Sequence, residues 1–186
     1  MSPPRIHLAH PVVSERTYRR FLRLPARRRL DGALAENATW AREWFAAYGR
    51  PWRVILPLPG DLAVRLAERF GGPGPLVLIA ASAGAEAETE AAVRWAEGEP
   101  DRYFFLESYA SAVVEALLDA GRKEAGSAHF LCPGYPGWPI EDNHLLLEAL
   151  QSAGPLPGPL TVLSSGMLKP KKSQLAVCPA AVAGLP

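Results

Sequence analysis

Leu76-Val77-Leu78-Ile79-Ala80-Ala81 is an apolar run of strand length near the middle of the chain. Because side chains on both faces of such a strand are apolar, both faces should be covered, as in the central strand of a sheet. A second compact β-favouring run, Val54-Ile55-Leu56, lies in a strand predicted over residues 52–58, whose end is limited by prolines. Together the two runs predict the middle of a β-sheet.

The rest of the chain supplies helices around these strands. Apolar residues that recur every three or four positions, with caps and breakers at the ends, predict helices over residues 15–24, 29–48, 61–70, 85–97, 101–123 and 140–151. Further strands are predicted over residues 127–131, 160–163 and 174–178, and residues 1–13 are expected to be loose. The predicted class is α+β. The last two strands could form a hairpin within the same sheet.

Charge is distributed unevenly along a chain whose net charge is only +1. Residues 1–53 carry eleven Arg and four acidic residues, whereas residues 54–148 carry six basic and fifteen acidic residues. We therefore divide the chain into a basic N-terminal arm (1–28), a folded domain (29–178) and a flexible tail (179–186). The arginines of residues 16–29 could dock an anion or a partner. Alternatively, they form a solvated face that pairs with the acidic middle of the chain.

Composition and cysteine usage limit the class of protein further. Cys132 and Cys178 lie 46 residues apart without a C-x-x-C pair, which argues against a structural zinc site. No signal segment and no apolar run of about 18 residues is present, so we expect a cytoplasmic protein without a membrane partner. The 19 prolines and the scarcity of Asn and Gln fit a heat-adapted protein. A GC-rich genome would explain the same composition equally well.

The most unusual local sequence is Cys132-Pro133-Gly134-Tyr135-Pro136-Gly137-Trp138-Pro139. Proline fixes φ and glycine permits positive φ, so a stiff, irregular loop is expected here. Such a loop should hold carbonyls that neither a helix nor a sheet satisfies, next to rigid aromatic faces. That combination suits a polar small molecule with a flat ring. The simpler interpretation is an ordinary proline-rich connector between a strand and a helix.

Several common catalytic motifs are missing. The sequence contains no H-E-x-x-H, no G-x-S-x-G and no glycine-rich dinucleotide turn. The alternating Glu86, Glu88 and Glu90 are interpreted as a solvated helix face. The arginine cluster has no interleaved aromatics, so we do not expect a nucleic-acid partner, although a basic nucleic-acid-binding arm is the third hypothesis.

Three segments together indicate a family. They are LVLIAASAG at residues 76–84 followed by an acidic helix, LESYASAVVEAL at residues 106–117, and PGYPGWP at residues 133–139 followed later by LSSGMLKPKKS at residues 163–173. In order and spacing they resemble the activation domain of cobalamin-dependent methionine synthase, and in particular its short, stand-alone versions. The resemblance covers residues 76–178 and is weaker over residues 29–75.

The resemblance implies a twisted, mainly antiparallel sheet with helices packed around it, and a site for S-adenosylmethionine. It also implies docking on a corrinoid-binding methionine synthase module and reductive remethylation of cobalamin, with electrons from a flavodoxin-type partner. The corrinoid motif Asp-x-His-x-x-Gly is absent from this sequence. Any cobalamin should therefore be carried by a partner protein.

Carried over residue by residue, the family's ligand loop corresponds to Cys132, Pro133, Gly134 and Tyr135. The position four residues before Gly134, where the family has a ligand-binding Arg, is Phe130. Phenylalanine offers none of the donors that arginine directs at a carboxylate. Lys169, Lys171 or Lys172 are candidates for the missing positive charge. The alternative hypothesis is a non-catalytic docking module that has kept the fold and lost the ligand.

Overall fold

The computed structural model describes residues 3–8, 10–25 and 27–181. Its main sheet has four strands, and every neighbouring pair is antiparallel. In spatial order the strands are β1 (Arg5–His7), β2 (Trp52–Pro57), β3 (Leu76–Ser82) and β6 (Ser173–Pro179). The predicted α+β class with a mainly antiparallel sheet is confirmed.

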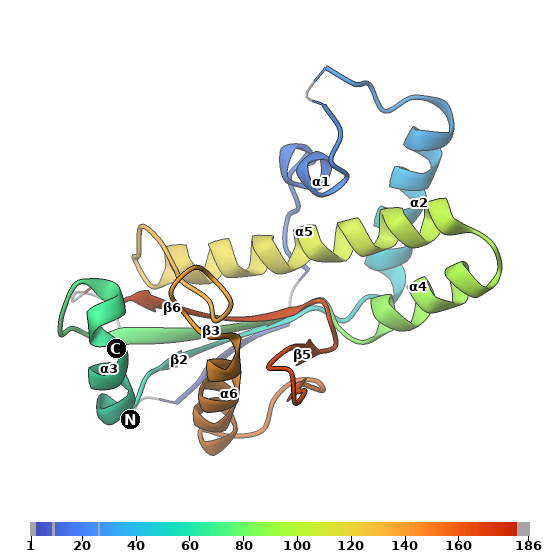
Figure 1. Ribbon diagram of the computed structural model, residues 1–186. Coiled ribbons are helices and arrows are strands. Elements are labelled where there is room, and N and C mark those ends of the chain that lie inside the picture. Colours follow the sequence, from blue (N-terminus) through green and yellow to red (C-terminus); the bar gives the residue numbers. More distant parts are fainter. Residues whose placement is uncertain (1–2, 9, 26, 182–186) are drawn as a thin grey trace.

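Helices cover the sheet on both faces (Figure 1). The larger layer contains the long α5 (Pro100–Glu124) together with α1 (Glu15–Phe21), α2 (Gly32–Tyr48) and α4 (Glu86–Ala96). On the other face lie α3 (Gly60–Leu66) and α6 (Asn143–Ser152). A short 3₁₀ helix, η1 (Ala67–Phe70), follows α3, and another, η2 (Ile140–Asp142), precedes α6. The structure therefore has two hydrophobic cores with one sheet between them.

The central strand β3 divides its side chains between these two cores. Val77, Ile79 and Ala81 belong to the core under α5, whereas Leu76, Leu78 and Ala80 belong to the core under α3 and α6. All seven residues of β3 are buried. This is the two-sided burial that the apolar run predicted, since successive side chains of a strand point to opposite faces.

A glycine allows α5 to approach the sheet closely. A Cβ atom at Gly121 would lie 2.8 Å from Cγ2 of Ile79 on β3, which is closer than side chains normally approach. The absence of a side chain at this position therefore brings the last turns of α5 against the sheet. The pocket described below lies earlier along the same helix.

The N-terminal region is more ordered than expected. Residues 1–13 were predicted to be loose, but Arg5–His7 form β1 and pair with β2. In α1, Tyr18 and Leu22 at its C-cap are buried in the helix-layer core. The boundaries at residues 28 and 178 stay predictions. β6 extends to Pro179, and residues 182–186 of the predicted tail lie outside the described residues.

The strand predicted over residues 127–131 is wrong. Only Leu131 bridges to the sheet, where its backbone exchanges hydrogen bonds of 2.9 and 2.8 Å with Val177 on β6. The carbonyls of Ser127 and Ala128 accept from the Arg122 guanidinium instead, at 2.6 and 3.2 Å. Backbone groups that are bonded to side chains are not available to form a ladder.

The predicted hairpin between the last two strands is also wrong. β4 (Thr161–Val162) pairs with β5 (Leu168–Lys169) in a separate two-stranded sheet, while β6 pairs along its whole length with β3. The turn between β4 and β5 is closed by hydrogen bonds of Leu163 with Met167 and with Gly166, and Gly166 has φ +78°. Lys169, one of the candidate lysines, is part of strand β5. Within the described ranges, no helix is long and apolar enough to cross a bilayer.

Candidate functional site

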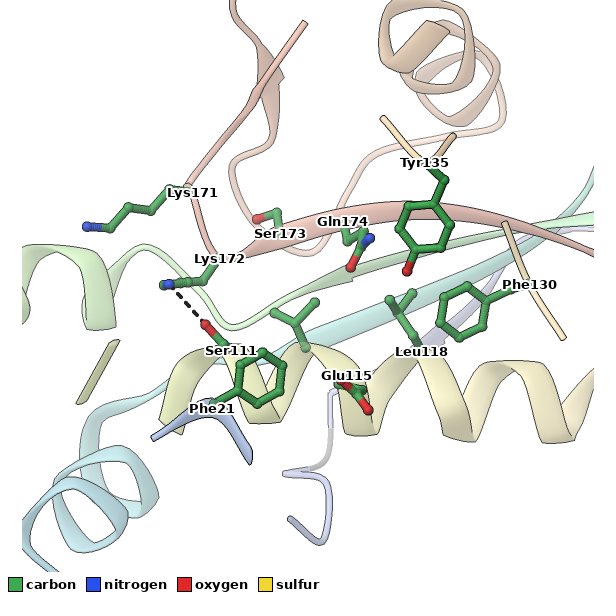
Figure 2. Close-up of a pocket in the computed structure, with 11 residues that line it drawn as sticks. Phe21, Ser111, Glu115, Leu118, Phe130, Tyr135, Lys171, Lys172, Ser173 and Gln174 are labelled. Carbon is green, nitrogen blue, oxygen red and sulfur yellow. Dashed lines mark hydrogen bonds between the residues drawn. The ribbon is translucent and has the colours of Figure 1, made fainter. Parts of the chain in front are cut away.

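A pocket of about 220 Å³ lies between α5, the start of β6 and the loop that follows Phe130. We call it the α5–β6 pocket (Figure 2). Helix α5 contributes Ser111 and Glu115, which are four residues apart and so share one helix face. The opposite side is formed by the segment from Lys171 to Gln174. The site therefore lies at the edge of the sheet, where the described part of the chain places no further full strand beside β6.

The β6 side of the pocket is fixed by the sheet. The carbonyl of Lys172 accepts a hydrogen bond of 2.9 Å from the Ala83 backbone, which continues the β3–β6 pairing one residue beyond the strand. The Ser173 hydroxyl lies 2.8 Å from the Ser82 hydroxyl on β3. The side chains at this end of β6 consequently start from a rigid backbone, as a binding site requires.

Lys172 connects β6 to α5 across the pocket. Its ammonium donates a hydrogen bond of 2.9 Å to the Ser111 hydroxyl (Figure 2) and lies 3.2 Å from a carboxylate oxygen of Glu107. Lys171 lies 2.9 Å from the other oxygen of the same carboxylate. Glu107 is only 13% exposed, so this carboxylate is a shielded centre shared by two cations.

Three aromatic residues from distant parts of the chain complete the pocket. They are Phe21 at the end of α1, Phe130 before the proline-rich loop and Tyr135 within it. In Figure 2, Tyr135 and Phe130 lie at one end of the pocket, and Lys172 lies at the other. Phe21 lies beside Ser111, nearer to Lys172. We call the end at Lys172 the cationic end.

The proline-rich loop differs from its prediction in one respect: several of its carbonyls are satisfied. The carbonyls of Cys132, Tyr135 and Trp138 accept hydrogen bonds from backbone amides within the loop, at 3.1, 2.9 and 2.8 Å. The glycines make these tight turns possible, since Gly134 has φ +90° and Gly137 has φ +81°. The loop is stiff as expected, but these three carbonyls are not free for a ligand to use.

The four predicted site residues do not lie equally close to the pocket. Tyr135 lines it and is 41% exposed, and Gly134 is exposed beside it. Cys132 and Pro133 are buried. Burial raises the pKa of the Cys132 thiol to about 12, although hydrogen bonds with Tyr135 and Gln174 lower it. Ligand contact by these four residues stays a prediction, and Tyr135 is the one whose side chain reaches the pocket.

Phe130 turns its ring toward the same pocket. Its side chain is half-buried and packs against the helix-layer core while lining the pocket. At the position where the resembling family has arginine, this chain therefore presents an aromatic face. The positive charge comes instead from Lys171 and Lys172, while Lys169 lies on β5 and lines a different cavity together with Pro170.

Glu115 gives the pocket an acidic group. It forms an ion pair with Arg20 of α1, so a residue of the predicted basic arm neutralises an acid of the central region. Burial, followed by the neighbouring Cys132, raises the pKa of Tyr135, and the Glu115 charge adds to this effect. At neutral pH the Tyr135 side chain is therefore protonated, and its hydroxyl can donate or accept a hydrogen bond.

The arrangement fits a ligand with an aromatic ring and a zwitterionic part. A ring can stack on Phe130 or Tyr135, an anionic group can approach Lys172, and a cationic group can approach Glu115. The volume is below the roughly 300–1,000 Å³ of pockets that enclose drug-sized ligands. A ligand with both parts would therefore extend past the pocket mouth or move side chains there. Within the described residues no group of His, Cys, Asp and Glu could hold a metal ion.

Sequence reasoning missed Phe21, Ser111 and Glu115 as pocket residues. Ser111 and Glu115 belong to the LESYASAVVEAL segment, where their four-residue spacing could have assigned them to one helix face. Nothing in the local sequence of Phe21 indicates a binding role, because its place in the pocket depends on how α1 packs on α5.

Comparison with known proteins supports the fold. No family model and no curated protein sequence matches the chain. Among solved structures, a crystal structure of the MetH reactivation domain bound to AdoHcy matches with a TM-score of 0.68. The match covers 99% of this chain and 80% of that one, at 12% sequence identity. The chain therefore has the fold of the methionine synthase reactivation domain, as its sequence segments predicted.

Proposed function

We propose that this chain binds S-adenosylmethionine in the α5–β6 pocket and serves to reactivate a separate corrinoid methyltransferase of the methionine synthase type. In this proposal the cobalamin is held by the partner protein. This chain would hold S-adenosylmethionine as the methyl donor, a flavodoxin-type partner would supply the one electron that reduction of the partner's cobalamin requires, and S-adenosylhomocysteine would be left in the pocket.

The observation that carries the proposal is the position of the α5–β6 pocket. The pocket is built from the segments that resemble the family, namely the α5 segment, the loop with Tyr135 and the block that ends in Lys171, Lys172 and Ser173. These segments are far apart in the sequence, and the fold brings them together around one cavity (Figure 2). The structural neighbour with this fold was crystallised with AdoHcy, the demethylated form of the same ligand.

The role of the chain's own residues would be to bind and orient the methyl donor. Phe130 and Tyr135 offer faces for the adenine ring, Glu115 an acceptor for the ammonium group, and the hydroxyls of Ser111 and Ser173 further hydrogen bonds. Holding the donor in one orientation converts an encounter in solution into an oriented reaction. The bond-making chemistry would belong to the ligand and the partner's cofactor.

Calorimetric titration with S-adenosylmethionine and with S-adenosylhomocysteine tests the proposal. We expect saturable binding of both, and loss of binding in Tyr135→Ala. Val64→Ala, on the exposed surface of α3, is a matched control that should bind normally. An absence of both heat and thermal shift at millimolar ligand would exclude this function.

A second candidate is a docking module that has lost the ligand, and Phe130 in place of the family's arginine favours it. This alternative predicts a complex with a corrinoid methionine synthase module whether or not S-adenosylmethionine is present. Analytical ultracentrifugation of the chain mixed with such a module, with and without ligand, separates the two. A complex that forms only in the presence of ligand would exclude the docking module.

A further inference from the structure

Two lysines share one carboxylate at the cationic end of the α5–β6 pocket. The ammonium groups of Lys171 and Lys172 lie 2.9 and 3.2 Å from the two oxygens of Glu107. Lys171 also has a second carboxylate nearby, because Glu88 accepts from the Lys171 backbone amide at 2.9 Å and its charge acts on the Lys171 side chain. Among the ion pairs of the described residues, Lys172 has only its share of Glu107.

The pocket is reached by the ammonium of Lys172 and not by that of Lys171. Figure 2 shows Lys171 extending away from the other lining residues, whereas Lys172 reaches toward Ser111 on α5. The Lys171 ammonium also lies 5.5 Å from the centre of the Tyr103 ring, which is outside the pocket. The Lys171 side chain is 39% exposed and that of Lys172 is 21% exposed. Lys172 is therefore the more shielded of the two cations.

The Lys172 ammonium can offer a further donor to a ligand. An ammonium group has three N–H bonds. Within the described part of the chain it donates a hydrogen bond to Ser111 and forms an ion pair with Glu107. These two contacts hold the nitrogen on the pocket wall. A charged donor in a partly shielded site forms a stronger hydrogen bond than a neutral one.

From this geometry we infer that Lys172, directly before β6, binds the carboxylate of an amino-acid ligand, and so takes over the role that a loop arginine would have at the position of Phe130. The inference rests on the proposed binding of S-adenosylmethionine. It orients that ligand, with the amino-acid carboxylate at Lys172 and the adenine ring toward Phe130 and Tyr135.

The orientation can be tested with two ligands that differ only in the carboxylate. Calorimetry is carried out with S-adenosylmethionine and with decarboxylated S-adenosylmethionine, on the wild-type chain, Lys172→Gln and Lys123→Gln. We expect Lys172→Gln to weaken S-adenosylmethionine binding roughly 10- to 100-fold and to leave binding of the decarboxylated ligand within about twofold. Lys123→Gln should bind both ligands as the wild type does, because this lysine is 68% exposed in the last turn of α5 and does not line the pocket.

The outcomes separate this inference from the function on which it rests. If the wild type binds neither ligand, the proposed function fails. If the wild type binds S-adenosylmethionine and Lys172→Gln weakens both ligands equally, or weakens neither, the carboxylate assignment is overturned and the proposed function stands. Thermal unfolding of each variant shows whether it is folded. We expect Lys172→Gln to fold, since Glu107 keeps Lys171 as a partner and the amide can still bond Ser111.

Discussion

The hydroxyl of Tyr18 in α1 donates a hydrogen bond of 3.1 Å to the backbone carbonyl of Phe105 in α5, and the tyrosine is completely buried. Its ring also packs edge-to-face against Tyr109, with the ring centroids 5.0 Å apart. Phe21, three residues later, lines the α5–β6 pocket. The same contact that attaches the N-terminal segment to the domain thus also positions one wall of the candidate site.

Substitutions at Tyr18 should separate the hydrogen bond from the packing. We expect Tyr18→Phe to lower the free energy of unfolding by about 1 kcal/mol, the usual net value of one hydrogen bond. Tyr18→Ala should cost about 3–5 kcal/mol, since it leaves a cavity between α1 and α5. Urea denaturation of both variants measures the difference. If both changes cost less than about 0.5 kcal/mol, the N-terminal segment does not belong to the cooperative core.

The buried thiol of Cys132 predicts a loss of stability in alkali. Burial raises its pKa from 9.0 to about 12 in the folded chain. Between these values the unfolded chain has released the proton and the folded chain has kept it, so the free energy of unfolding falls as pH rises. This stabilisation is complete below about pH 9 and is lost as pH rises toward 12.

Comparison with Cys132→Ala isolates this effect, because Cys178, whose pKa is also raised by burial, is present in both proteins. Urea denaturation at pH 8 and pH 10.5 should show the stability advantage of the wild type shrinking by up to about 2 kcal/mol at the higher pH. An advantage that stays constant between the two pH values would show that the thiol ionises alike in both states.

The conformation of Gly134 should be needed for the placement of Tyr135. Its φ of +90° is unfavourable for any residue with a side chain, although a Cβ atom there would meet Ile140 only at an ordinary 3.7 Å. Gly134→Ala should therefore cost about 1–2 kcal/mol through backbone strain alone. Gly60→Ala, at the first residue of α3 with open space around it, should be neutral or slightly stabilising. Thermal unfolding of the two variants tests this contrast, and equal effects would contradict it.

The sheet could be predicted where side-chain pattern determines it, and not where pairing depends on distant partners. The apolar run Leu76–Ala81 predicted a strand covered on both faces because its side chains are apolar on both faces. The short β1 was missed because residues 5–7 alternate polar and apolar side chains within only three positions, too few to give a periodic signal. The pairing of β6 with β3 rather than with β4 could not be read from adjacency in the sequence.

The same distinction holds for the site. Tyr135 could be selected from its loop, because prolines and glycines in the sequence indicate stiff, irregular backbone. In the structure two of these glycines, Gly134 and Gly137, do have positive φ. Lys172 was one of three candidate lysines, and only the fold shows that its neighbour Lys171 is directed away while Lys169 lies elsewhere. Phe21 and Glu115 meet in the pocket through the packing of α1 on α5, which no local pattern encodes.

Phe130 offers a final prediction, on which part of the ligand lies at its end of the pocket. Because Phe130 and Lys172 lie at opposite ends (Figure 2), we expect Phe130→Arg in a Lys172→Gln background to give no recovery of S-adenosylmethionine affinity. It should weaken S-adenosylmethionine and the decarboxylated ligand alike, because the aromatic face offered to the adenine ring is lost. The change should also lower stability by about 1–3 kcal/mol, because a half-buried aromatic contact with the core is lost. Phe130→Leu keeps an apolar contact without the aromatic face or a donor, and should weaken both ligands to a similar extent in calorimetry. If Phe130→Arg instead recovers S-adenosylmethionine affinity by about tenfold and leaves the decarboxylated ligand unimproved, the carboxylate lies at the Phe130 end of the pocket and the proposed orientation is wrong.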